Sequence, residues 1–179
     1  MNNEFIEHYI RPVMEVLYTK DALLFDQNLS LSERCIAFRF AHYLQNKFDE
    51  LGEYNVFVDC DYNSHLEYEN GEWKRHPGKP IQDRDGSGVT GRFIDLIVHQ
   101  RKENKDSENW SDLICFELKK WDNPKKERGE KDKNNLERLT SDYGYHYGFH
   151  IIFGPTKEAV QIEIFEGGQT CGGPLQLFQ

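Results

Sequence analysis

Two strongly apolar stretches of the sequence each carry an acidic residue, and this feature constrains the fold more than any other. The first is RFIDLIVHQR, residues 92–101, which contains Asp95, and the second is LICFELKKW, residues 113–121, which contains Glu117. Runs so rich in Ile, Leu, Val and Phe predict β-strands. Because an unpaired buried carboxylate costs of order several kcal/mol, each acid is expected to be paired or to bind a metal.

The second stretch also has a lysine two residues after its glutamate. Residues i and i+2 of a strand project from the same face. Glu117 and Lys119 are therefore expected to lie side by side, while Phe116 and Leu118 face the other way. The pair is either a salt bridge or part of a reaction centre.

A hydrophilic segment, residues 102–110, joins the two strands and predicts a hairpin that brings Asp95 beside Glu117. Two carboxylates a few ångströms apart repel each other, and a lysine or a divalent cation makes the arrangement tolerable. Mg²⁺ suits such a site because it prefers oxygen ligands and typically uses one or two carboxylates. A bound metal can acidify a water and stabilise charge on a phosphate, which Lys119 can help to hold. The set is chemically coherent for phosphodiester hydrolysis.

Helical periodicity predicts two further elements upstream. One covers residues 3–20, with Pro12 as a kink or a new start. The other begins at Ser30, with Glu33 three residues later in capping-box spacing, and stops at Gly52. Glu33 falls at the N-terminal end of the apolar stripe of this helix, whose other members are Ala37, Phe40, Leu44, Phe48 and Leu51.

The rest of the chain predicts one mixed sheet covered by helices. Further strands are expected at 54–63 and in GFHIIFG and AVQIEIFEGG, and a charged loop at 122–135 leads into a helix near KNNLERLTSDY. Residues 64–90, rich in Gly and Pro, predict turns or a mobile loop. We expect a single α/β or α+β domain over residues 1–179, with an extra N-terminal helix at about 3–20 and a polar insertion at about 64–90.

Composition restricts the class of function. The net charge of −9 disfavours non-specific coating of nucleic acid, although residues 119–133, KKWDNPKKERGEKDK, are locally basic. The opening MNNEFIEHYI lacks the apolar core of a signal sequence, and no stretch reaches the ~20 apolar residues of a membrane span. The four cysteines show no zinc spacing, and three have apolar neighbours, which predicts reduced core thiols in a cytoplasmic protein.

FIDLIVH and LICFELKK, with the upstream helix that bears Glu33, resemble the PD-(D/E)xK nuclease superfamily, also called restriction-endonuclease-like. The resemblance extends roughly from Glu33 to Phe153 and implies an αβββαβ core, in which a mixed central sheet is flanked by helices. Ile94 stands where the Pro of the name-giving motif would be, and this position varies widely.

The same resemblance implies a role for each matching residue. Asp95 and Glu117 would bind the metal together with the backbone carbonyl of Leu118. Lys119 would be catalytic, and Glu33 would help to bind metal or water. The function implied is a Mg²⁺-dependent endonuclease, a hydrolase of phosphodiester bonds that accepts Mn²⁺ in place of Mg²⁺ and acts on nucleic acid, with DNA favoured.

Two other functions stay open. One is a non-catalytic interaction module on the same fold, such as a subunit of a phage-defence or restriction assembly, which the negative charge favours. The other is a small-molecule phosphohydrolase, for which no nucleoside pocket is visible. A homodimer and a larger protein assembly are both compatible with the sequence, and no membrane association is expected.

Several of these residues also have a structural interpretation. Asp95 could cap a turn, and the capping box alone could account for Glu33. Asp61 is a candidate extra ligand, although DYN favours a turn there. Lys131, with Asp132 beside it, is a candidate auxiliary residue, but a solvated helix start is favoured. His146 and His150 are spaced i, i+4 without the glutamate of HExxH, so both are interpreted as structural.

Overall fold

The computed structural model describes residues 2–29, 31–62, 65–69, 72–76, 80–82, 89–91, 94–100, 111–121 and 126–178, with side chains left undescribed for 2–3, 61–93, 111–113 and 126–128. The helices of the described residues are α1 (Asn2–Phe5), a π-helical turn (Ile6–Ile10), α2 (Arg11–Lys20), α3 (Glu33–Glu50) and α4 (Lys126–Asp142), with 3-10 turns at Ala22–Phe25 and Lys157–Ala159. None of the helices in these ranges is both long and apolar enough to cross a membrane.

One sheet organises the molecule. Its strands are β1 (Val56–Tyr62), β6 (Ile94–Gln100), β7 (Ser111–Lys120), β8 (Tyr147–Phe153), β9 (Gln161–Glu166) and β10 (Gln169–Thr170), in that spatial order, and β11 (Leu175–Gln176) also pairs with β9. The β7–β8 pair is parallel, and the other pairs in this sheet are antiparallel. The chain is therefore a mixed α/β protein with a mostly antiparallel sheet.

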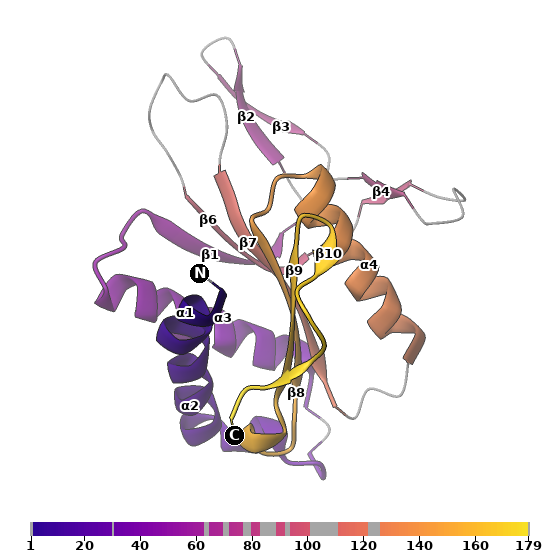
Figure 1. Cartoon of the computed structure of the whole chain (residues 1–179). Coiled ribbons are helices and arrows are strands. Elements are labelled where there is room, and N and C mark those ends of the chain that lie inside the picture. Colours follow the sequence, from indigo (N-terminus) through magenta and orange to yellow (C-terminus); the bar gives the residue numbers. More distant parts are fainter. Residues whose placement is uncertain are drawn as a thin grey trace.

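Helices cover both faces of this sheet (Figure 1). On one face, Phe40 and Leu44 of α3 belong to a large apolar cluster with Phe116 and Leu118 of β7. On the other face, α4 contributes to a smaller cluster. The members of that cluster are Ile94, Ile97, Cys115, Leu136, Leu139, Tyr145 and Phe165. Because β7 is covered on both sides, its residues are apolar in an almost continuous run, as expected of a central strand.

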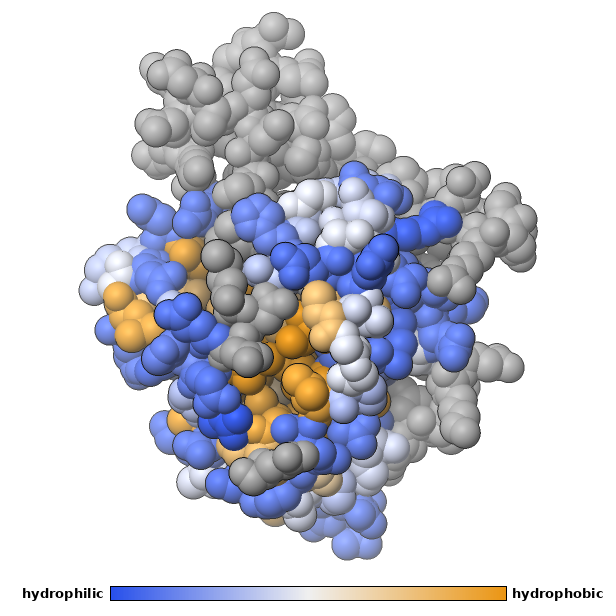
Figure 2. All heavy atoms as spheres, viewed as in Figure 1, coloured by the Kyte–Doolittle hydropathy of each residue, from blue (hydrophilic) through white to orange (hydrophobic). Residues whose placement is uncertain are grey.

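The helices α1–α3 and the C-terminal strands close around the larger cluster. Seen as in Figure 1, hydrophobic residues gather between α1–α2 and β9, and hydrophilic residues surround them (Figure 2). Leu17 of α2, Ile162 of β9 and Leu177 after β11 are all buried members of this cluster. The N-terminal helix and the last strands therefore belong to the same core as α3.

Several predicted boundaries are wrong. The N-cap of α3 is Ser32, whose Oγ accepts a hydrogen bond from the backbone N–H of Arg34. Glu33 is therefore the first residue of the helix, and the capping box predicted between Ser30 and Glu33 does not form. Leu51, expected on the buried stripe, is half exposed because it lies past the helix end. Ser30 and the turn at 102–110 lie outside the described residues.

Two segments predicted as loops contain regular structure. Helix α4 begins at Lys126, so most of the loop expected at 122–135 is helical. The polar insertion at about 64–90 includes two antiparallel strand pairs, β2 (His65–Glu69) with β3 (Glu72–His76) and β4 (Pro80–Gln82) with β5 (Val89–Gly91).

All four cysteines are free, as predicted, but only Cys115 is a core residue. Cys35, Cys60 and Cys171 are exposed, so the expectation that three of the four cysteines are core residues is wrong.

Candidate active site

The register between β6 and β7 brings the two predicted acids together. Leu96 pairs with Phe116 and Ile97 with Cys115, which places Asp95 at the level of Glu117. Strand β6 begins at Ile94, whereas β7 continues to Lys120, so the end of β7 extends past its neighbour. Phe116 and Leu118 face the larger core, and Glu117 and Lys119 face the other side, as the alternation predicts.

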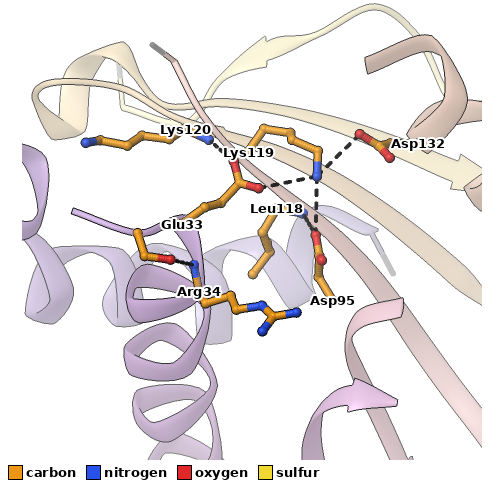
Figure 3. A network of polar contacts seen from close by, with 8 residues as sticks. Glu33, Arg34, Asp95, Leu118, Lys119, Lys120 and Asp132 are labelled. Atoms are coloured by element: carbon orange, nitrogen blue, oxygen red, sulfur yellow. Dashed lines mark hydrogen bonds and ion pairs between the residues drawn. The ribbon is translucent and has the colours of Figure 1, made fainter. Parts of the chain in front are cut away.

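Two carboxylates accept hydrogen bonds from the backbone at the end of β7. The N–H of Leu118 donates to Asp95 Oδ2 at 2.8 Å, and the N–H of Lys120 donates to Glu33 Oε2 at 2.8 Å. Backbone N–H groups in the interior require partners, so both acids have a structural task at the end of β7. The hydrogen bond from Lys120 to Glu33 also fixes the first turn of α3 against the sheet, as Figure 3 shows.

Lys119 lies at the centre of the acids (Figure 3). Its Nζ is 3.4 Å from Asp132 Oδ2, 3.5 Å from Glu33 Oε1 and 3.6 Å from Asp95 Oδ2. Burial alone would lower the pKa of Lys119, but the negative charges of Asp95, Asp132 and Glu33 outweigh burial and raise its pKa above the ordinary value. Lys119 is therefore a fixed ammonium group at neutral pH.

Glu117 is the most deeply buried acid of the group, with 4% of its surface exposed. Burial first, and then the charges of Asp95 and Asp132, hold the pKa of its carboxyl well above the usual 4.5. Its ionised form is therefore disfavoured until a positive charge approaches. Four carboxyl groups face one ammonium group in this cluster, which is the electrostatic setting that a divalent cation relieves.

Asp132 belongs to the cluster, although a solvated position was favoured for it from the sequence. Lys131 and Asp132 were expected at a solvated helix start; both lie inside α4, where Lys131 is exposed and Asp132 faces the sheet. Burial raises the pKa of Asp132, and the Lys119 ammonium opposes this rise. The spacing of Asp132, Leu136 and Leu139 (i, i+4, i+7) could have revealed its orientation, since the two leucines are buried.

A second row of polar residues continues from Glu117 across the sheet. Glu117 pairs in register with His150, and His150 pairs with Glu163. Glu163 Oε2 is 2.5 Å from Lys133 Nζ of α4. His150 is 3% exposed, and burial, together with the charges of Lys133 and Lys119, lowers its pKa to about 4.

The other predicted site residues are not all brought together. His146 is exposed and precedes β8, so the two histidines form no metal pair. Asp61 lies in β1, one residue before its end, rather than in the turn expected there, and its side chain is outside the described set. Among the described residues, no group of three or more His, Cys, Asp and Glu side chains is arranged to hold a metal ion. One or two carboxylates with water are, however, enough for Mg²⁺.

A cleft of about 220 Å³ opens beside the acids. It is lined by Glu33, Arg34, Ala37, Phe38, Cys60, Asp95 and Leu118. The side chain of Arg34 extends from α3 toward the side of Asp95 (Figure 3). Sequence reasoning singled out neither Arg34 nor Phe38, because both lie off the apolar stripe of α3, where exposed residues carry no signal.

Comparisons with models of protein families, with curated proteins and with solved structures gave no match for this chain.

Proposed function

We propose that this protein is a metal-dependent nuclease that hydrolyses phosphodiester bonds in DNA. One observation carries the proposal: Lys119 is held by three carboxylates from three different elements, directly beside the buried Glu117. Such a concentration of acids around one lysine, next to a cleft, exceeds what a single structural salt bridge requires. The groups with perturbed pKa values, Glu117, Lys119 and Asp132, lie beside this cleft, and such clusters are typical of functional sites.

The element order supports a restriction-endonuclease-like architecture. Helix α3, strands β1, β6 and β7, helix α4 and strand β8 follow one another in the αβββαβ order, with β2–β5 inserted after β1. In this architecture the first helix, the second and third core strands and the later helix would each supply a residue to one site. Here they supply Glu33, Asp95, Glu117 with Lys119, and Asp132.

The residues present fit a divalent cation. Asp95 and Glu117 are adjacent carboxyl groups, and the pKa of Glu117 is raised first by burial and then by the charges of Asp95 and Asp132, which a cation would offset. In our proposal these two residues and the Leu118 carbonyl hold Mg²⁺, or Mn²⁺ in its place. When bound, the ion would supply acidification of a water and stabilisation of charge on the phosphate.

The protein's own groups have separate tasks in this proposal. Lys119 stays protonated, so it donates hydrogen bonds to the phosphate or to the attacking water rather than acting as a base. Glu33 and Asp132 orient the ammonium group from opposite sides. Asp95 holds the end of β7 through the Leu118 N–H, so the same carboxylate links strand geometry to the site.

Nicking of plasmid and of single-stranded circular DNA by purified variants tests the proposal. Asp95→Asn and Lys119→Ala should abolish Mg²⁺- or Mn²⁺-dependent nicking while retaining the wild-type circular dichroism spectrum. Asp49→Asn is the matched control, because Asp49 is an exposed aspartate near the far end of α3. Nicking at the wild-type rate by either site variant would refute the assignment.

One observation favours a non-catalytic interaction module instead. Asp95 and Glu33 already have partners within the chain, two backbone N–H groups and Lys119, so these two acids have partners without a metal. Calorimetric titration of Mg²⁺ into the wild type and Asp95→Asn separates the two functions. Binding that the substitution removes supports the nuclease, whereas no heat with either protein supports the interaction module.

A further inference from the structure

Phe38 is exposed on the cleft that Glu33 and Asp95 line. It has 64% of its surface accessible, although it is a large aromatic residue. A single exposed apolar side chain is common on protein surfaces and needs no explanation by itself. Phe38, however, lines the same cleft as Glu33 and Asp95, which gives its exposure a specific location.

Helix geometry sets the chemistry of the cleft wall. Glu33 and Ala37 are four residues apart on α3, and so are Arg34 and Phe38, so two adjacent rows run along the first two turns. The first row combines an acid with a small residue, and the second combines a guanidinium with an aromatic ring. Leu118 lies on the sheet side of the cleft but is fully buried, so the apolar wall consists of Ala37 and Phe38. The cleft therefore offers an apolar wall and an arginine next to the carboxylates.

The size of the cleft limits what can enter it. At about 220 Å³ it is smaller than the ~300–1,000 Å³ of pockets that enclose a drug-sized ligand. A single flat group is compatible with this space. A base within a duplex is stacked on both faces, so an aromatic side chain reaches such a face only where the base is unpaired or extruded.

We propose that Phe38 stacks on an unpaired nucleobase next to the scissile phosphate and that Arg34 contacts an adjoining phosphate, so that the substrate is single-stranded. The inference rests on the proposed nuclease function, which it narrows to one class of substrate. Aromatic rings and arginine planes are the groups on which unstacked bases commonly lie. Because a net charge of −9 disfavours binding through phosphates, stacking supplies an attraction that does not depend on the protein's charge.

Binding can be measured without cleavage in a Lys119→Ala background. Fluorescence anisotropy with a labelled single-stranded oligonucleotide and Mg²⁺ should show that adding Phe38→Ala weakens binding about 5- to 150-fold, the range for loss of one base–aromatic stack. Adding Phe38→Trp should preserve binding, because tryptophan retains a stacking surface. Tyr54→Ala is the control, since Tyr54 is an aromatic residue 72% exposed beyond the end of α3.

An abasic scan distinguishes stacking from a general surface effect. An oligonucleotide that lacks the stacked base should bind the parent protein more weakly but should lose no further affinity on Phe38→Ala. Arg34→Gln should reduce the slope of log affinity against log salt by about 0.7, the value for one phosphate on a single strand. The inference would be overturned if the parent protein and Phe38→Ala bound the single-stranded oligonucleotide equally well. It would also be overturned if the parent protein bound a duplex of the same sequence as tightly as the single strand.

Cleavage assays with the wild type and Phe38→Ala on the same oligonucleotides separate the two proposals. If both proteins cut single strands with the same KM, the stacking inference fails and the nuclease function stands. If neither cuts any substrate but binding depends on Phe38 as described, hydrolysis fails and the single-strand site stands. Phe38 is exposed, so its replacement should leave the thermal midpoint unchanged, and this is checked first.

Discussion

Lys119 makes three ion pairs with acids from α3, β6 and α4, and the pair with Asp132 is the one that sequence reasoning did not foresee. Asp132 Oδ2 is buried and has no directed hydrogen bond among the described residues, so its partner at 3.4 Å is the Lys119 ammonium itself. We therefore interpret Asp132 as a positioning residue for the lysine. Among the described residues, Asp132 makes no hydrogen bond to Asp95 or Glu117, the two side chains proposed to bind the metal.

Replacing Asp132 by Asn should leave Mg²⁺ binding intact and lower kcat. When the charge of Asp132 is removed, Lys119 is drawn toward Glu33 and Asp95. A displacement of about 1 Å in a catalytic group can cost about 10²-fold in rate. The measurement is steady-state nicking, with kcat separated from KM, and calorimetric Mg²⁺ titration of the same sample.

Two further variants make that measurement decisive. Asp132→Glu restores the charge and should recover part of kcat, whereas Glu130→Gln removes an exposed acid of the same helix and should have no effect. A change in KM alone, or the same loss with Glu130→Gln, would contradict the positioning role.

The adjacency of the site residues was predictable only where short-range geometry fixes it. Alternation along β7 placed Glu117 and Lys119 on one face, and the expected pairing of two consecutive strands brought Asp95 beside them. Asp132 comes from an element that was taken for a loop. Nothing in the sequence signals that Phe38 lines a cleft.

At the scale of elements, β8 places His150 between Glu117 and Glu163 in a row of polar residues across the sheet. The pKa of His150 is lowered to about 4, mainly by burial, so the folded protein holds a neutral imidazole where the unfolded chain takes up a proton below about 6.5. A lowered pKa in the folded state means that stability is fully present above pH 6.5. It is lost progressively as the pH falls toward 4.

His150→Gln should remove this pH dependence from the metal-free protein. Between pH 7.5 and pH 4, the wild type should lose about 3 kcal/mol of unfolding free energy relative to the variant. Urea denaturation in chelator at several pH values measures the difference. Glu117 changes the unfolding free energy with pH in the opposite direction, but it does so in both proteins, so the comparison with the variant cancels its contribution. A difference that stays constant over this pH range would show that His150 is not held neutral.

The order of the elements was easier to foresee than their ends. Strands β6 to β9 and helix α3 have apolar patterns that burial imposes, so they were predicted close to their observed positions. The first turns of α4 are almost entirely charged, and its buried leucines, Leu136 and Leu139, lie further along the helix. A solvated helical turn and a charged loop have the same composition, and so the boundary was missed.

For the molecule as a whole, the site lies where two layers of helices reach one end of the sheet. Helix α3 comes from one face, α4 from the other, and the end of β7 carries Lys119 between them (Figure 3). An ion bound to Asp95 and Glu117 would therefore join groups that only the folded chain brings together. A ligand that binds only the native state stabilises it by mass action.

Mg²⁺ should consequently raise the thermal midpoint of the whole protein. At a concentration about 100 times its Kd, the stabilisation is about 2.7 kcal/mol, which corresponds to about 5–10 °C for a chain of this size. Differential scanning fluorimetry with increasing MgCl₂, at ionic strength held constant with NaCl, measures the shift. Asp95→Asn should abolish it, and Asp49→Asn should retain it. An equal shift in all three proteins would mean that Mg²⁺ acts on the −9 net charge in general, and it would remove the support for a specific ion between Asp95 and Glu117.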